Sequence, residues 1–301
     1  MTYEDEIYEI IYVKMEELLN KMDEDYPEKY SRKLNNWMLE EFDKEIISNL
    51  TFVSSFESKY GNMFEHIVKD IAKLKFGEEN VPETIIGFGV SESEYETKRR
   101  ELIIKNSKAK NPKQYIISKY NKKENESILS DFRNSRVAEG RGGSRIESRL
   151  TQAELPKLLD GRLDYEGEIY GQEVDLMIFD PEEEKIKLFE IKVGGDLDNS
   201  NAPKNIEKML KIYSCLGDET SELYFATLYN KEGEGRPWNG IVKTHIGEDC
   251  ILIGKDFWDV ILKDITFNDF KEINKRVIND TNFNSRIKSL KNKYTTLDEF
   301  F

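Results

Sequence analysis

The sequence predicts an α/β fold in which a central mixed β-sheet is flanked by helices, with a helical N-terminal region and a basic insertion. Three observations predict it. Apolar residues recur at spacings of three and four over the first 76 residues, which is the period of a helix. Two dense apolar runs follow further along the chain, separated by a short polar turn. Both alternating sets of positions in these runs are apolar, which is typical of strands covered by helices on both faces.

The N-terminal quarter of the chain is expected to be helical. One apolar stripe predicts a helix over residues 3–22, and a second stripe runs from Trp37 to Leu50. A third helix is expected over residues 52–76, ended by Gly77, because glycine readily adopts the conformation that ends many helices. Residues 1–54 are therefore interpreted as an N-terminal helical region that precedes a core domain.

The predicted strands lie in the second half of the chain. The two apolar runs cover residues 174–179 and 186–193, and the sequence DPEEEK between them is typical of a turn. A helix is expected next, over about 203–216, then strands at 223–229 and 251–253 and helices around 257–262 and 267–278. We expect a core domain over residues 55–265 and a C-terminal helical segment over residues 266–301.

The composition is that of a globular protein with a sizeable core. The chain has 301 residues, of which 38% are hydrophobic, and it contains 16 Phe, 15 Tyr and 3 Trp. This excludes a disordered chain and a small disulfide scaffold. No apolar run approaches the roughly 20 residues of a membrane span, and the acidic start does not resemble a signal peptide. We therefore expect a cytoplasmic protein. The two cysteines and two histidines lack the spacing of structural zinc ligands.

The net charge of -14 is unevenly distributed along the sequence. Residues 98–149 contain 15 Lys and Arg but only 6 Asp and Glu, so a basic segment interrupts an acidic chain. A local basic patch is what binds a nucleic acid, whatever the net charge of the protein. We interpret residues 80–150 as a DNA-contacting insertion, in which Arg141 and Arg145 stand beside glycines that permit close approach to a backbone. A solvated loop is the alternative interpretation.

The turn between the two apolar runs predicts which charged residues meet. If the four residues 181–184 form the loop, then Asp180 faces Lys185, and counting outward pairs Asp175 with Glu190. Lys192 lies on the same face because strand side chains alternate with a period of two. Two carboxylates and an ammonium group thus converge within the most apolar part of the chain.

Such a cluster favours metal-assisted chemistry. Crowded carboxylates on an apolar sheet repel each other and are costly to desolvate, and a divalent cation relieves both effects. Oxygen ligands without a nearby histidine or cysteine favour Mg²⁺, held by Asp175 and Glu190. Lys192 would orient a water or stabilise the charge that develops on a phosphate. The alternative is a structural ion pair between Lys192 and one of the carboxylates.

These residues resemble a known superfamily. Asp175, followed by the sequence Glu190-Ile191-Lys192 on a hairpin with a helix and a strand after it, is similar to the PD-(D/E)XK core of type II restriction endonucleases. The resemblance covers residues 55–77 and 165–262. Within it, YFATLYNKEGEGRPW at 224–238 and IGKDFWDVI at 253–261 are similar to the end of the TdeIII-type restriction enzymes.

The resemblance implies a function and its partners. It implies a Mg²⁺-dependent endonuclease that hydrolyses phosphodiester bonds of double-stranded DNA at a short specific site. Such an enzyme would act as a homodimer, because cutting both strands of a palindrome needs two sites related by a two-fold axis. A cognate DNA methyltransferase would be its genetic partner. The resemblance also implies a further catalytic glutamate on the helix before the core, for which Glu65 is the candidate; a surface glutamate is the alternative.

A polar loop after the second strand supplies further candidates for DNA contacts. Asn199, Asn201 and Lys204 stand where a loop enters the helix predicted over 203–216, and helix N-termini and amide groups suit phosphates. Ordinary helix capping by this loop is the alternative.

Two other classes of function remain open from the sequence. One is a non-catalytic DNA-binding or interaction protein on the same fold, in which the carboxylates form a structural pair. The other is a carboxylate-pair hydrolase such as a glycosidase. The lysine in the cluster and the basic segment favour a nuclease over a glycosidase.

Overall fold

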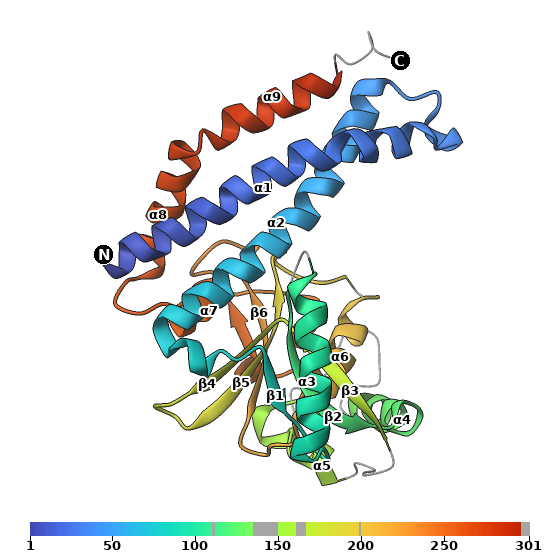
Figure 1. Ribbon diagram of the computed structural model, residues 1–301, viewed down its shortest axis with the longest axis vertical. Coiled ribbons are helices and arrows are strands. Elements are labelled where there is room, and N and C mark those ends of the chain that lie inside the picture. Colours follow the sequence, from blue (N-terminus) through green and yellow to red (C-terminus); the bar gives the residue numbers. More distant parts are fainter. Residues whose placement is uncertain (110–111, 135–149, 161–166, 199, 296–301) are drawn as a thin grey trace. The chain divides into compact units, whose positions relative to one another are not determined.

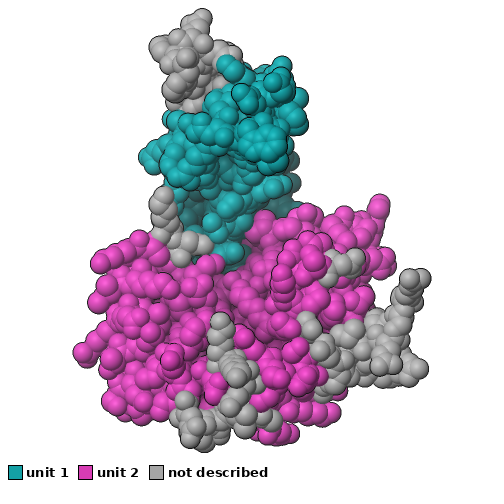
Figure 2. Space-filling model, turned by 90° about the vertical axis from the view of Figure 1, so that its right-hand side faces the viewer, with its two compact units in different colours: residues 1–71, 262–301 teal, residues 72–261 magenta. Residues whose placement is uncertain are grey.

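The computed structural model describes residues 1–109, 112–134, 150–160, 167–198 and 200–295. The chain divides into two compact units (Figure 2): residues 1–71 with 262–301 form unit 1, and residues 72–261 form unit 2. Arg141, Arg145 and Asn199 lie outside the described residues. The described helices include none that combines the length and the apolar character of a membrane span.

Unit 1 is helical. It contains α1 (Tyr3–Leu34), most of α2 (Lys44–Phe76), α8 (Phe267–Asp280) and α9 (Phe283–Thr295), and a 3₁₀ turn over Trp37–Leu39. The helix α1 packs against α8 and α9, and its apolar stripe is buried as the sequence predicts. Capping boxes begin α1 at Thr2 and α8 at Thr266, where each side chain accepts a backbone hydrogen bond and an aspartate three residues on accepts one in return.

The helix boundaries in this region differ from those predicted. The helix α1 continues twelve residues past Met22, and the second and third predicted helices form the single helix α2, whose residues from Ala72 onward belong to unit 2. No break occurs at the predicted boundary: the helix continues through Thr51, whose hydroxyl donates to the carbonyl of Ile47, one turn back in the same helix (2.8 Å). The predicted end of the helix at Gly77 is confirmed: α2 ends at Phe76, and Gly77 has a φ of 95°.

Unit 2 contains two mixed β-sheets, as Figure 1 shows. The first has the order β1 (Thr84–Ile86), β2 (Gln114–Tyr120) and β3 (Glu168–Val174), with β1 parallel and β3 antiparallel to β2. The second has the order β4 (Leu176–Asp180), β5 (Lys185–Lys192), β6 (Glu222–Thr227) and β7 (Ile251–Ile253). In it β4 and β5 form an antiparallel hairpin, and β5, β6 and β7 are parallel. The α/β class with a mixed sheet is thus confirmed, whereas its division into two sheets was not predicted.

Helices cover both faces of these sheets. Unit 2 contains α3 (Glu92–Ser107), α4 (Lys122–Asn134), α5 (Lys157–Asp160), α6 (Ala202–Leu216) and α7 (Lys255–Ile261). The helix α6 contacts strands of both sheets. On β2, Ile116 packs in the core formed with α6, whereas Tyr115 and Ile117 pack in a second core with Leu102 of α3. The alternation of strand side chains therefore places α6 and α3 on opposite faces of the first sheet.

The segment 80–150 contains elements that the sequence did not reveal. It forms β1, α3, β2 and α4, and β2 is the central strand of the first sheet. Its few apolar residues, such as Tyr115 to Ile117, lie in a short run that is too brief to stand out in a polar sequence. Short 3₁₀ turns at Glu78–Asn80, Gln152–Glu154, Ile241–Thr244 and Glu248–Cys250 connect the remaining elements of unit 2.

Candidate active site

The β4–β5 hairpin has the predicted register. Asp180 pairs with Lys185 across the turn, and the ladder continues to Leu176 and Phe189. The next residue outward on each strand is Asp175 or Glu190. Asp175 occupies the single position between β3 and β4, where the chain passes from the first sheet to the second. Its Oδ2 accepts a hydrogen bond from the backbone N–H of Ile191 (3.0 Å), which fixes its carboxylate beside β5.

The second carboxylate and its lysine lie on the α6 side of β5. Leu188 of this strand packs in the core that contains α6, and Phe189 packs edge-on against Phe257 of α7. Glu190 and Lys192 share the parity of Leu188, so they also face α6. The Glu190 side chain is fully buried, and Nζ of Lys192 lies 2.5 Å from its Oε1 and 4.0 Å from Oδ2 of Asp175. The structure therefore brings together the three residues that the sequence singled out.

Two further lysines reach the same carboxylates. Lys208 of α6 has its Nζ 3.2 Å from Oδ1 of Asp175 and 2.5 Å from Oε2 of Glu190. The contact with Glu190 is an ion pair by distance, but Oε2 of Glu190 receives no hydrogen bond of good geometry among the described residues. Lys113, just before β2, lies 4.0 Å from Oδ1 of Asp175. The sequence analysis did not single out either lysine as a site residue.

The charges of this cluster oppose the cost of burial. Burial favours the neutral form of Asp175, but the ammonium groups of Lys208, Lys192 and Lys113 outweigh it and hold the pKa of Asp175 below its ordinary value. Burial and the neighbouring Asp175 carboxylate raise the pKa of Glu190, and the two nearest lysines only partly offset this. Burial lowers the pKa of Lys208, but the attraction of the Glu190 and Asp175 carboxylates raises it by more, so its pKa lies above its ordinary value. A further positive charge would therefore stabilise the ionised form of Glu190 more than that of Asp175.

The donor set fits a divalent cation that keeps part of its hydration shell. Asp175 and Glu190 supply carboxylate oxygens, and Oε2 of Glu190 and Oδ1 of Asp175 share the ammonium group of Lys208 as their charged neighbour. No group of three or more His, Cys, Asp and Glu side chains suited to a metal occurs among the residues that the structure describes. Two carboxylates are sufficient for an ion that takes its remaining ligands from water and from substrate phosphates.

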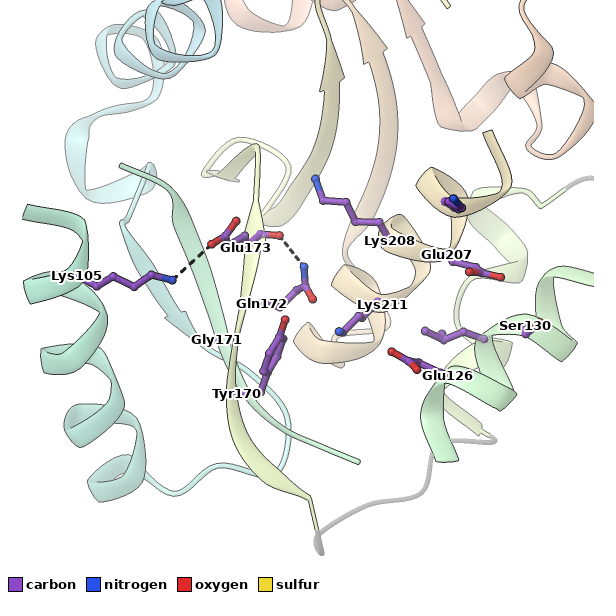
Figure 3. Close-up of a pocket in the computed structure, with 12 residues that line it drawn as sticks. Lys105, Glu126, Ser130, Tyr170, Gly171, Gln172, Glu173, Glu207, Lys208 and Lys211 are labelled. Carbon is purple, nitrogen blue, oxygen red and sulfur yellow. Dashed lines mark hydrogen bonds and ion pairs between the residues drawn. The ribbon is translucent and has the colours of Figure 1, made fainter. Parts of the chain in front are cut away.

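A cavity of about 660 Å³ adjoins the carboxylates through Lys208 (Figure 3). Lys211 lines it from α6, across from Tyr170 of β3, whereas the side chain of Lys208 carries its ammonium group to the carboxylates and that of Glu173 points toward Lys105. Nζ of Lys211 lies 4.6 Å from the centre of the Tyr170 ring and 4.7 Å from that of Tyr120, which are cation–π distances. The helices α3, α4 and α6, with strand β3, line the cavity: Lys105, Glu126, Leu129, Ser130, Tyr170, Gly171, Gln172, Glu173, Lys204, Glu207, Lys208 and Lys211.

The other predicted site residues have different positions. Lys204 is exposed and lines this cavity, on the same face of α6 as Lys208 and Lys211. The side-chain amide of Asn201 donates to Oδ2 of Asp198 (2.8 Å), so Asp198 organises the loop before α6. Glu65 is half-buried in α2 and belongs to unit 1, whereas Asp175 and Glu190 belong to unit 2. The roles of Glu65, Asn199, Arg141 and Arg145 stay predictions.

The spacing of the α6 lysines is the signal that could have revealed Lys208 and Lys211. Lys204, Lys208 and Lys211 recur at spacings of four and three, opposite the apolar stripe that contains Ile206 and Leu210. This places three positive charges on one face of the helix that follows the Glu190–Lys192 strand. Only Lys204 was singled out from the sequence, because it is nearest to the polar loop.

The comparisons with known proteins identify the family. The model of the family described as type II restriction endonuclease, HinfI, matches residues 3–278, which is nearly the whole chain. No curated protein and no solved structure matches the chain. The finer similarity to TdeIII-type enzymes stays a prediction. The site geometry, with two carboxylates and lysines beside a cavity lined by further lysines and by glutamates, agrees with the chemistry of DNA cleavage. The chain belongs to the HinfI family of type II restriction endonucleases, which are hydrolases that cleave double-stranded DNA at specific sites.

Proposed function

We propose that Asp175, Glu190 and Lys192 form the active centre of this endonuclease. Type II restriction endonucleases generally use a divalent metal, and we propose that this metal is Mg²⁺ here, held by Asp175 and Glu190. The observation that carries this proposal is the convergence of the three side chains at the junction of the two sheets, with Lys192 Nζ 2.5 Å from Glu190 and 4.0 Å from Asp175. When bound, Mg²⁺ would polarise the scissile phosphodiester and promote ionisation of the attacking water.

The residues of the chain provide the remaining parts of the chemistry. The backbone N–H of Ile191 holds the Asp175 carboxylate in place, so little reorganisation is needed when the cation and the phosphate arrive. The buried Glu190 contributes a second negative charge in a place shielded from water, where electrostatic interactions are strong. Lys192 lies near enough to both carboxylates to orient a water or to neutralise the charge that develops on the phosphate.

The DNA backbone is proposed to follow the cavity beside α6. Lys204, Lys208 and Lys211 lie on its wall, and Lys105 lies on the α3 side. Cations along a groove neutralise successive phosphates and position the scissile bond without reading its sequence. Arg141 and Arg145, together with Asn199 and Asn201, remain candidates for further DNA contacts, and Glu65 remains the candidate for a further catalytic carboxylate.

We also propose that the enzyme acts as a homodimer in the cytoplasm, beside a cognate DNA methyltransferase that protects the host DNA. Two copies related by a two-fold axis would bring two active sites to the two strands of a symmetric sequence.

In unit 1, Trp37 is 78% and Met38 62% exposed, and Phe42 and Ile46 are each 47% exposed. These neighbouring apolar side chains support self-association of unit 1. Sedimentation of the wild type and of the Trp37→Lys, Met38→Lys double variant tests this, and a monomeric wild type at micromolar concentration would contradict it.

Digestion of DNA of diverse sequence tests the active centre. The wild type should produce a fixed set of fragments in Mg²⁺ and none in EDTA. Asp175→Asn and Glu190→Gln should abolish cleavage while retaining the circular dichroism spectrum. Glu168→Gln provides a matched control, because Glu168 is an exposed glutamate of β3. Cleavage by Asp175→Asn or Glu190→Gln at the wild-type rate would overturn the assignment.

A further inference from the structure

Lys208 and Lys192 contact different oxygens of the same two carboxylates. Lys192 approaches Oε1 of Glu190 and Oδ2 of Asp175, whereas Lys208 approaches Oε2 of Glu190 and Oδ1 of Asp175. The Lys208 ammonium is therefore a single cation that bridges both carboxylates, at 2.5 and 3.2 Å. A divalent cation held by the same two carboxylates would supply the positive charge that Lys208 now supplies.

The charge balance makes the two cations competitors. Lys192 and Lys208 balance the two negative charges of Asp175 and Glu190, whose side chains are 9% and 0% exposed, and Lys113 adds a third ammonium group 4.0 Å from Asp175. A divalent cation added to this group would leave at least two uncompensated positive charges in a poorly solvated place, which is strongly unfavourable. Departure of one ammonium group relieves this repulsion, so binding of the cation and the contacts of one lysine exclude each other.

The position of Lys208 makes it the lysine that can leave. Lys192 belongs to the central strand pair β5–β6, whereas Lys208 extends from α6 along the wall of the cavity that it lines. Its side chain is 35% exposed, against 26% for Lys192. Rotation about its side-chain bonds is sufficient to move the ammonium group from the carboxylates to the cavity, where Lys204 and Lys211 already lie.

We infer that Lys208 takes the place of the divalent cation in the metal-free protein, and that binding of the cation releases its ammonium group into the cavity, where it contacts a DNA phosphate. This inference rests on the proposed metal site at Asp175 and Glu190. It has a thermodynamic consequence. Without DNA the protein binds the cation weakly, because Lys208 must give up its ion pairs, and DNA in the cavity strengthens binding of the cation by accepting the released charge.

Calorimetric titration of the DNA-free protein with Ca²⁺ tests the competition without any measurement of cleavage. Lys208→Met should bind Ca²⁺ about tenfold more tightly than the wild type, or more, which is within the usual range for coupling between two ligands. Lys204→Met removes the same charge from the same face of α6, one turn away, and should bind Ca²⁺ as the wild type does. Lys208→Arg, which keeps the charge, should not gain affinity.

A second measurement uses the wild type and so does not depend on the folding of a variant. Amine acetylation followed by mass spectrometry should show faster modification of Lys208 in Ca²⁺ than in EDTA, with Lys204 unchanged. Equal Ca²⁺ affinity of Lys208→Met and the wild type, together with unchanged acetylation of Lys208, would overturn the inference. Failure of the metal site itself has a different signature: Asp175→Asn would then bind Ca²⁺ as the wild type does.

Discussion

The side-chain amide of Gln114 bonds both backbone polar groups of Met177. Its Oε1 accepts from the N–H of Met177 (2.9 Å) and its Nε2 donates to the carbonyl of the same residue (3.0 Å). Gln114 also pairs with Val174 in the β2–β3 ladder. Gln114, the first residue of β2, thus holds both Val174 at the end of β3 and Met177 near the start of β4. Asp175 lies between these two anchored residues.

This bridge predicts that Gln114 positions Asp175, the proposed catalytic aspartate. Gln114→Met fills a similar volume but leaves the buried N–H and carbonyl of Met177 without partners, which costs about 1–3 kcal/mol of unfolding free energy. The altered position of Asp175 should lower the cleavage rate constant at saturating DNA about tenfold or more, because small displacements of catalytic groups are costly. The Kd for DNA in Ca²⁺ should change less than twofold.

Cleavage by Gln114→Met should be measured well below its denaturation midpoint, so that the fraction of unfolded protein is negligible. A full cleavage rate together with reduced stability would assign Gln114 a structural role alone.

Lys192 is predicted to act on the chemical step. Lys192→Ala removes an ammonium group that lies within 4.0 Å of both carboxylates, and loss of such transition-state stabilisation commonly costs about 100-fold or more in rate. Single-turnover cleavage with DNA bound in Ca²⁺ and started by Mg²⁺ measures this step directly. Retention of the wild-type rate would show that Lys192 is only the partner of a buried ion pair.

The cavity lysines are predicted to contribute to the salt dependence of DNA binding. Lys204→Ala and Lys211→Ala should each reduce the slope of log K against log salt by about 0.9, because each lost phosphate contact releases one counterion fewer. Lys185→Ala is the control of equal charge, because Lys185 begins β5 at the end opposite Lys192 and is paired with Glu222. The Arg141→Ala, Arg145→Ala pair should also lower the slope. Slopes for Lys204→Ala and Lys211→Ala no lower than the slope for Lys185→Ala would contradict a DNA path along α6.

The hairpin that carries Glu190 could be predicted because its information is local. A four-residue loop between two apolar runs sets the register, and the register then determines which carboxylates meet. The end of α2 at Gly77 was also predictable, because the need for a positive φ depends on neighbouring residues only.

The contact of Lys208 with the carboxylates depends on long-range packing. Its position on a basic helix face is visible in the sequence, but the crossing of α6 over both sheets follows from burial of Ile206, Met209 and Leu210 against distant strands. Gln114 could not be predicted either, because its partner Met177 lies 63 residues further along the chain. Both residues complete the site through contacts between the two sheets and α6, which no local pattern describes.

The buried ion pair of Asp180 and Lys187 predicts how stability depends on pH. Nζ of Lys187 donates to Oδ2 of Asp180 (2.8 Å), and the N–H of Glu182 donates to its Oδ1 (3.0 Å). Burial raises the pKa of Asp180, but these hydrogen bonds outweigh it, so the pKa lies below its ordinary value of 3.8. A carboxyl with a lowered folded-state pKa stabilises the fold fully above its unfolded pKa, and this contribution is lost as the pH falls through the folded pKa.

Asp180→Asn should therefore lower the free energy of unfolding by about 1–3 kcal/mol at pH 7, since it removes one of the two carboxylates in ion-pair contact with the buried Lys187 and leaves Glu183. The difference from the wild type should persist down to about pH 4, near the ordinary pKa, and then shrink as the pH falls from that value through the lowered pKa of the folded state, where only the unfolded chain is fully protonated at Asp180. Urea denaturation of both proteins between pH 7 and pH 3 measures it, and taking the difference cancels the acid sensitivity of all other carboxyls. A difference that stays constant over this range would show that the Asp180 carboxylate does not contribute through its charge.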